Sequence, residues 1–263
     1  MWIAVFLGII QGLTEFLPVS SSGHLVLLQQ FFELPGDKLF FDLALHVGTL
    51  VPVLWVYRAD LIRMVKAPLA ESGPVAERPG TRLMGLIILG SIPTAAIGLL
   101  FEDLFEQLFA TPAALSMTFA ITGWLLFFSG KAPKGESGEM QMKPWQALVI
   151  GLAQGLAITP GISRSGTTIA VALFLGMRRE YAARFSFLLS IPAIGGAFLL
   201  KLRDITPADI QLDATLLGAF AALVSGYLAL NLLIKLVKTG DFSKFAWYAW
   251  AVAIFSLIVT LLK

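Results

Sequence analysis

The feature that most constrains this chain is a 14-residue segment that occurs twice and is broken each time by a proline. Residues 11–24 read QGLTEFLPVSSSGH and residues 154–167 read QGLAITPGISRSGT, at a constant offset of 143 residues. Each copy passes from an apolar stretch through a proline turn into the serine-rich start of another apolar stretch. Proline ends a helix, and serine favours the start of the next one. The repeat therefore predicts two pairs of short helices, joined by the first elbow (residues 17–22) and the second elbow (residues 160–165).

Long apolar runs surround both elbows. The chain is 57% hydrophobic and 14% charged, with a mean hydropathy of +0.82, which is far more apolar than a soluble domain. These values predict an all-α integral membrane protein. A length of 263 residues allows six spans and the two elbows in a single transmembrane domain. The chain has no cysteine, which excludes disulfides, thiolate metal ligands and cysteine nucleophiles.

The apolar segments differ in length, and length separates spanning helices from shorter ones. A helix needs about 20 residues to cross the hydrocarbon core. Six segments satisfy this, at residues 39–57, 83–101, 112–129, 184–200, 212–235 and 245–262. The halves of the repeated segments are too short, at about 1–16 and 20–32, then 144–158 and 164–177. We therefore expect six transmembrane helices and two re-entrant helical hairpins, at residues 1–32 and 144–177.

The distribution of basic residues predicts the orientation, because cytoplasmic loops collect lysine and arginine. If the spans alternate, 14 of the 19 basic residues share one side, which we assign to the cytoplasm. These are Arg58, Arg63, Lys66, Arg78, Arg82, Lys131, Lys134, Lys143, Arg178, Arg179, Arg184, Lys235, Lys238 and Lys244. The outer side receives Lys38, Lys201, Arg203 and Lys263, and Arg164 remains within the membrane.

This orientation makes the first hairpin enter from outside and the second from inside. The two repeats, about 1–129 and 144–263, are then predicted to have inverted topology. Inverted repeats with broken helices place their irregular backbone near the membrane midplane, where it lines a polar cavity. We therefore expect the two elbows to face each other across one site.

The residues at the elbows favour binding of an anion. The start of a helix offers unpaired N–H groups and a positive dipole end to a phosphate. The hydroxyl groups of Ser20, Ser22, Ser163 and Ser165 stand there, although an ordinary capping role is the alternative for Ser20 or Ser163 alone. Arg164 is costly at membrane depth, and its planar fork suits a phosphate. The alternative for Arg164 is a structural ion pair with Glu15.

Other side chains of the first hairpin suggest how such a site would act. Glu15 is acidic and follows Gln11 by one helical turn, so the two could hold a divalent cation. Ser21 aligns with Arg164 in the repeat and is the candidate nucleophile, with His24 as its base and acid. A satisfied core residue is the equal alternative for His24. His46 lies inside the span at 39–57, and we expect it to be structural.

The two segments resemble signatures of a known family. QGLTEFLPVSSSGH at residues 11–24 and PGISRSG at residues 160–166 are similar to motifs of the bacterial undecaprenyl-pyrophosphate phosphatases that are unrelated to the acid-phosphatase superfamily. The resemblance covers essentially the whole chain. It implies hydrolysis of a C55 isoprenyl pyrophosphate to the monophosphate and inorganic phosphate, which recycles carrier lipid for cell-wall synthesis. It also implies a multi-pass protein of the bacterial inner membrane and the help of Mg²⁺ or Ca²⁺.

By the same resemblance a defined set of residues carries the site. These are Glu15, Ser20, Ser21, His24, Ser163, Arg164, Ser165 and Thr168. The family's pattern begins with a first acidic residue where this chain has Gln11, which could coordinate a cation but brings no charge. The groups assigned to chemistry lie on the hairpin that enters from outside, so we expect the site to open to the outer face.

Two other classes of function fit part of the pattern. Inverted repeats that meet at an anion site are also the plan of secondary transporters, so a flippase or carrier of a phosphate-bearing lipid or anion is the alternative. A non-catalytic membrane scaffold would leave the buried Arg164 and Glu15 unexplained. We expect membrane lipid and the isoprenyl pyrophosphate as partners and no nucleic acid, and the sequence leaves open whether two copies form a homodimer.

Overall fold

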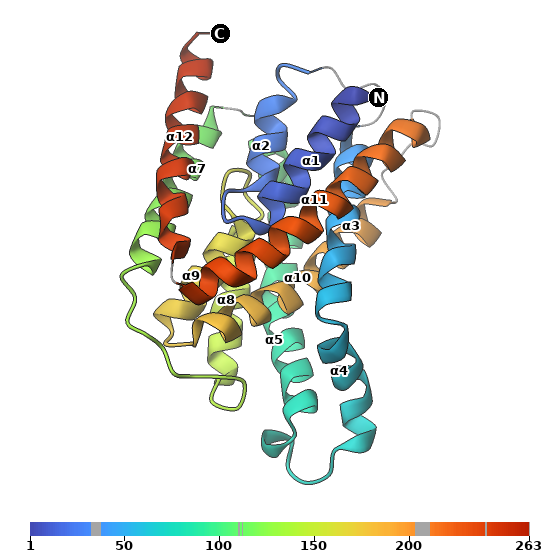
Figure 1. Ribbon diagram of the computed structural model, residues 1–263, viewed down its shortest axis with the longest axis vertical. Helices are drawn as coiled ribbons and strands as arrows, with labels where there is room; N and C mark the ends of the chain where they lie inside the picture. The colour runs from blue at the N-terminus through green and yellow to red at the C-terminus, as the bar shows by residue number, and fades with distance from the viewer. Residues whose placement is uncertain (33–37, 110, 112, 203–210, 240, 263) are drawn as a thin grey trace.

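The computed structural model describes residues 1–32, 38–109, 111, 113–202, 211–239 and 241–262 (Figure 1). Within these residues the regular elements are helices, and one isolated bridge joins Ser137 and Met177. Arg203 and Lys263, assigned to the outer side from the sequence, lie outside the described residues. The elements in chain order are α1 (Trp2–Phe16), α2 (Ser21–Leu28), α3 (Lys38–Val56), α4 (Arg58–Ala70), η1 (Val75–Glu77), α5 (Pro79–Leu100), α6 (Glu102–Phe109), α7 (Ala114–Ser129), α8 (Pro144–Leu156), α9 (Arg164–Phe174), α10 (Arg179–Lys201), α11 (Leu212–Thr239), η4 (Asp241–Lys244) and α12 (Phe245–Leu261).

Five helical segments in the described part of the chain are long and apolar enough to cross a membrane. They are Lys38–Val56, Pro79–Leu100, Arg179–Lys201, Leu212–Lys238 and Phe242–Leu261. These confirm the spans predicted near 39–57, 83–101, 184–200, 212–235 and 245–262. The sixth predicted span, 112–129, corresponds to α7, which has 16 residues and qualifies only together with α6. Since α6 and α7 meet at a bend of 105°, they form either a broken span or a re-entrant segment.

The two repeated segments are broken helices, as their prolines predict. The chain leaves α1 after Phe16 and enters α2 at Ser21, and it leaves α8 after Leu156 and enters α9 at Arg164. The backbone takes a positive φ in each elbow, 67° at Ser20 and 88° at Gly161. Glycine adopts this conformation readily, whereas a serine does so only where its surroundings hold it. Both second helices, α2 and α9, end a few residues earlier than predicted.

The first helix of each broken pair packs on a helix from the other half of the chain. Helix α1 lies along α11, and α8 lies along α5. Glycine residues allow the close approach: a Cβ atom on Gly8 would lie 2.1 Å from Gly218 O, and one on Gly151 would lie 1.8 Å from Gly90 O. Small residues at helix contacts are typical of membrane proteins. Gly8 and Gly151 are again 143 residues apart, so the repeat continues into the packing of the helices.

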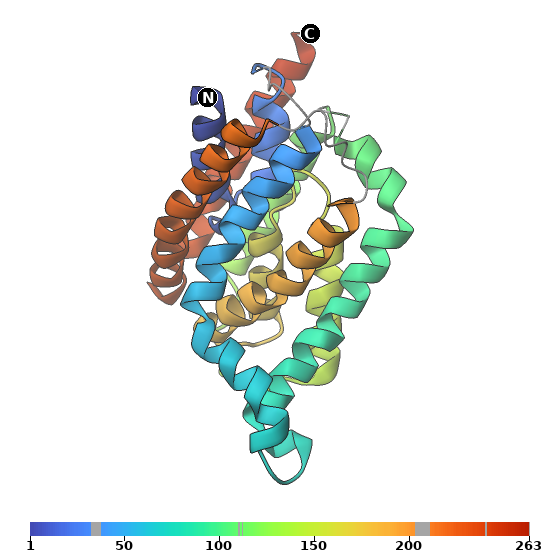
Figure 2. The same cartoon turned by 90° about the vertical axis from the view of Figure 1, so that its right-hand side faces the viewer.

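The molecule is elongated, with both chain ends at one end (Figure 1). Figure 2 shows α4 and the start of α5 projecting together at the opposite end. A network of ion pairs holds this region to the rest of the fold. Arg184 of α10 binds Asp60 of α4 at 2.5 and 2.9 Å, and Arg63 binds Glu139 at 2.8 Å. Because Glu139 belongs to the connection before α8, the network ties that connection to α4 and α10.

Candidate active site

The two elbows meet at an ion pair between Glu15 and Arg164. Glu15 lies near the end of α1 and Arg164 opens α9, yet Arg164 Nη2 donates to Glu15 Oε1. Only 6% of the Glu15 side chain and 15% of the Arg164 side chain are exposed. The pair offered above as the structural alternative for Arg164 is therefore present. Arg164 still has a buried nitrogen, Nη1, with no hydrogen-bond partner among the described residues, so the pair leaves a donor for a ligand.

The second oxygen of Glu15 gathers the neighbouring polar groups of the first hairpin. Ser21 Oγ donates to Glu15 Oε2 at 2.5 Å, and Gln11 Nε2 donates to the same oxygen at 3.0 Å. All three residues are buried. A carboxylate that accepts a hydrogen bond from a serine is placed to take that proton. The group next to the candidate nucleophile is thus Glu15.

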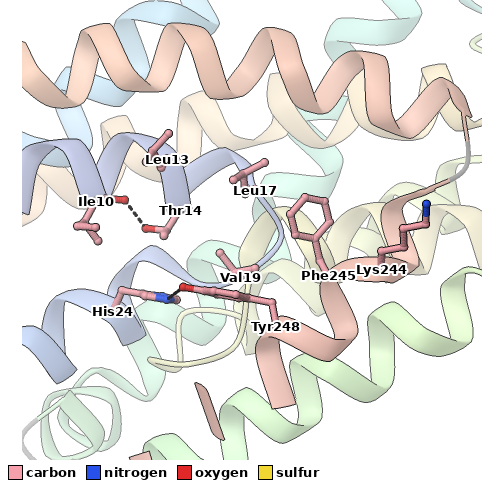
Figure 3. A pocket seen from close by; sticks show the side chains of 9 residues that line it. All are labelled: Ile10, Leu13, Thr14, Leu17, Val19, His24, Lys244, Phe245 and Tyr248. Atoms are coloured by element: carbon pink, nitrogen blue, oxygen red, sulfur yellow. Dashed lines mark hydrogen bonds between the residues drawn. The ribbon is translucent and has the colours of Figure 1, made fainter. Parts of the chain in front are cut away.

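His24 lies beside a different partner from the one expected. Its Nδ1 is 2.7 Å from the backbone oxygen of Ser20 and its Nε2 is 2.8 Å from Tyr248 Oη. A carbonyl oxygen can only accept, so Nδ1 carries a proton, and Nε2 of the neutral ring accepts from the Tyr248 hydroxyl. The two rings are parallel, with centroids 5.7 Å apart (Figure 3). The expected pairing of His24 with Ser21 is not among the contacts of the described residues.

His46 of α3, assigned a structural role from the sequence, lies at the site. Its Nε2 is 3.7 Å from Glu15 Oε2, and its Nδ1 is 2.8 Å from the backbone oxygen of Asp42. A carbonyl oxygen only accepts, so Nδ1 carries a proton, and Nε2 faces the Glu15 carboxylate. The rule that an ionisable residue inside a span is a functional candidate could have identified His46.

The serines of the first elbow mainly shape the backbone. Ser20 Oγ accepts from Gly23 N at 3.3 Å and from Gly161 N at 3.1 Å, so it caps α2 and joins the two elbows. Ser22 Oγ lies 3.4 Å from Ser20 Oγ. The capping role considered for Ser20 is present, and it adds a contact that the sequence did not predict.

The hydroxyl groups of the second elbow divide between capping and packing. Ser163 Oγ accepts from Gly166 N at 3.1 Å and lies 3.3 Å from Ser165 Oγ. Thr168 donates to the backbone oxygen of Arg164 and lies 2.5 Å from Ser186 Oγ of α10. Thr168 is thus engaged in holding α9 on α10. Thr167 was not among the expected site residues, although it aligns with His24 in the repeat. It is buried, and its Oγ1 has no hydrogen-bond partner in the described part of the chain.

The donors for a metal ion are few. No group of three or more His, Cys, Asp or Glu side chains that could hold a metal is found in the described part of the chain. Gln11 Oε1, however, is buried and has no hydrogen-bond partner among the described residues, while Nε2 of the same amide donates to Glu15. Gln11 and Glu15 each carry an oxygen acceptor one helical turn apart on α1, and Mg²⁺ and Ca²⁺ take oxygen ligands.

A pocket of about 370 Å³ lies on the other side of His24 (Figure 3). It is partly open and is bordered by α1, the first elbow, α2, the end of η4 and the start of α12. Its lining residues are Ile10, Leu13, Thr14, Leu17, Val19, His24, Lys244, Phe245 and Tyr248. On α1 these lie on a different face from Gln11 and Glu15, since successive residues are rotated by about 100°. The ion pair and the pocket therefore adjoin the same elbow from two sides.

Similarity to known proteins extends over nearly the whole chain. The family model described as bacitracin resistance protein BacA matches residues 4–255. A protein of Carboxydothermus hydrogenoformans named undecaprenyl-diphosphatase is 44% identical over 97% of this chain and 96% of its own. Proteins of the same name from Methanobrevibacter smithii and Desulfosudis oleivorans are 44% and 48% identical, over 95% and 94% of this chain and 94% and 93% of their own.

Proposed function

The chain belongs to the bacitracin resistance protein BacA family, and we propose that it hydrolyses undecaprenyl diphosphate to undecaprenyl phosphate and inorganic phosphate. This reaction returns carrier lipid to cell-wall synthesis. The observation that carries the proposal is the meeting of Ser21, Glu15 and Arg164, which brings a hydroxyl, a proton acceptor and a guanidinium together. Positioning and neutralisation of charge are most of what phosphoryl transfer requires.

Each group has a role in this proposal. Arg164 binds the terminal phosphate through its unpartnered Nη1 while Nη2 stays on Glu15. The N–H groups at the starts of α2 and α9 add donors for the same phosphate. Ser21 Oγ attacks the terminal phosphorus while Glu15 takes its proton over the 2.5 Å hydrogen bond, and the bond to undecaprenyl phosphate breaks. Water then hydrolyses the phosphoserine to inorganic phosphate and free Ser21. His24 was the base expected from the sequence, but its Nε2 binds the Tyr248 hydroxyl, so Glu15 takes the role of base in this proposal.

A divalent cation, Mg²⁺ or Ca²⁺, fits the first hairpin. Gln11 Oε1 and one Glu15 oxygen would hold it, because these cations take oxygen ligands. When bound, the ion supplies positive charge next to the diphosphate.

We also propose that the fold consists of two inverted repeats in one domain, about 1–129 and 144–263, with re-entrant hairpins at 1–32 and 144–177. The reciprocal packing of α1 on α11 and of α8 on α5 supports this arrangement, because each hairpin occupies the equivalent place in the other repeat. Such a fold needs six spans, of which α6 and α7 together would supply one.

The proposed orientation places the Arg58–Arg82 loop in the cytoplasm and the site open to the outer face of the bacterial inner membrane. The uneven distribution of basic residues supports it. The chain has no cysteine, so single cysteines at Ser72 and Gln107 can be labelled with an impermeant maleimide on intact cells. We expect labelling at Gln107→Cys and protection at Ser72→Cys. The reverse pattern would move the site to the cytoplasmic face.

The decisive experiment measures phosphate release from undecaprenyl diphosphate by purified protein in detergent. We expect multiple turnovers, loss of activity with a chelator and recovery when Mg²⁺ or Ca²⁺ is added. A flippase or carrier needs two compartments and would release no phosphate in detergent. Activity that is unchanged by exhaustive chelation would remove the cation from the proposal and leave the hydrolysis intact.

A further inference from the structure

The pocket beside His24 has walls suited to a hydrocarbon. Ile10, Leu13, Leu17, Val19 and Phe245 supply most of its lining. The hydroxyl of Thr14 donates to the backbone oxygen of Ile10 at 2.7 Å and is therefore used within its own helix (Figure 3). A lysine side chain such as that of Lys244 can line an apolar surface with its methylene groups. The polar groups among the lining residues are therefore the hydrogen-bonded pair of His24 and Tyr248 and the ammonium of Lys244.

Residues that line the pocket are direct neighbours in the sequence of residues at the ion-pair site. Thr14 lines the pocket and Glu15 binds Arg164, and Val19 lines the pocket immediately before Ser20. The His24 ring joins the two sides, because it lines the pocket and its Nδ1 binds the backbone oxygen of Ser20. A molecule that fills the pocket therefore ends next to the start of α2.

We propose that this pocket receives the part of the isoprenyl chain nearest to the diphosphate. The inference rests on the proposed function and adds to it the place and direction of the lipid. The apolar walls bury the branched hydrocarbon, and burial of apolar surface stabilises binding. The pair of His24 and Tyr248 marks the boundary between chain and head group. The phosphate attached to the chain then lies nearer to His24, and the terminal phosphate lies nearer to Arg164.

Two neighbouring positions on α1 provide a matched test. Leu13 lines the pocket and is 37% exposed, whereas Ile9 is 41% exposed and does not line it. Because the chain has no native cysteine, Leu13→Cys and Ile9→Cys can each be labelled with a maleimide in detergent. The probe is a non-hydrolysable farnesyl methylene-diphosphonate, used at a concentration that inhibits phosphate release by the wild type.

We expect the farnesyl probe to slow labelling at position 13 by about tenfold, because the buried chain excludes the reagent, and to leave position 9 unchanged. Methylene-diphosphonate without a chain should protect neither position. Equal protection at both positions, protection by the chainless compound, or no protection at position 13 would overturn the proposal. A wild type that releases no phosphate would instead overturn the proposed function, so the two failures can be distinguished.

Kinetics give an independent reading of the same inference. A tryptophan at position 13 would fill the pocket, so we expect Leu13→Trp to raise KM for farnesyl diphosphate by about tenfold while Ile9→Trp does not. The effect on the C5 compound isopentenyl diphosphate should be smaller, because a short chain fills less of the pocket. An equal effect of Leu13→Trp on both substrates would indicate a general disturbance of α1 and would contradict a subsite for the chain.

Discussion

Replacement of Glu15 by glutamine tests the centre of the site most directly. The change nearly conserves shape but removes the negative charge and the acceptor that receives the Ser21 proton at 2.5 Å. A positioned general base contributes about 10²- to 10⁴-fold to a rate. At about 1.4 kcal/mol for each factor of ten, the activation barrier should rise by roughly 2.7–5.4 kcal/mol. We therefore expect kcat of Glu15→Gln to fall by at least about a hundredfold.

The same substitution has a separate structural cost. Arg164 keeps only 15% of its side chain exposed and would lose its counter-ion. Removing one partner of a buried pair costs about 3–5 kcal/mol, and the lower value applies here because Arg164 retains some contact with solvent. Thermal unfolding in detergent should show this loss. Kinetics must then be measured well below the unfolding temperature, so that the fall in kcat reports chemistry.

The assay is phosphate release at saturating farnesyl diphosphate, with Glu106→Gln as the control. Glu106 is a carboxylate whose side chain is 61% exposed, and it pairs with Lys201 at the surface. Exposed ion pairs contribute about 0–1 kcal/mol, so this variant should behave like the wild type. If Glu15→Gln retained more than about a tenth of the wild-type kcat, Glu15 could not be the acceptor of the Ser21 proton.

Three further changes probe other contacts. Arg164→Lys should lose most activity although the charge is kept, because an ammonium cannot reproduce the planar fork, and near-wild-type turnover would remove the two-point contact. Tyr248→Phe should lower kcat in the wild type but have no further effect in a His24→Ala variant, because the Tyr248 hydroxyl acts through the His24 ring. Tyr227→Phe is the control. Additive effects of the Tyr248 and His24 substitutions would show that the two side chains act independently. Hydrogen bonds from Thr81, and from Gly80, lower the pKa of the Glu71 carboxyl below its ordinary value of 4.5. The stabilisation by the Glu71 carboxylate is therefore present above that value and is lost as pH falls through the folded-state pKa. Glu71→Gln should lower Tm at pH 7, and its Tm should converge with that of the wild type in acid. An equal difference in Tm at both pH values would exclude the carboxylate as the cause.

Local pattern was sufficient for the helices and for the elbows. A run of about 20 apolar residues must form a helix in a membrane, because its backbone groups have no other partners there. Proline followed by serine ends one helix and starts the next, so the breaks at Pro18 and near Pro160 could be predicted from neighbouring residues. The importance of Arg164 followed from the same physics, because a guanidinium at membrane depth requires a partner.

The partners of the site residues depended on the packing of helices that are distant in the chain. The sequence offered His24 to Ser21 because they are one turn apart, but the distant helix α12 brings Tyr248 to the His24 ring. The exception is the bond between Ser21 and Glu15, which are six residues apart and meet through the bend of the first elbow. His46 approaches Glu15 only because of the way α3 packs beside α1. The periodicity of a sequence predicts which face of a helix a side chain occupies. Which residue of another helix lies against that face depends on how the two helices cross, and the crossing depends on all the contacts between their surfaces.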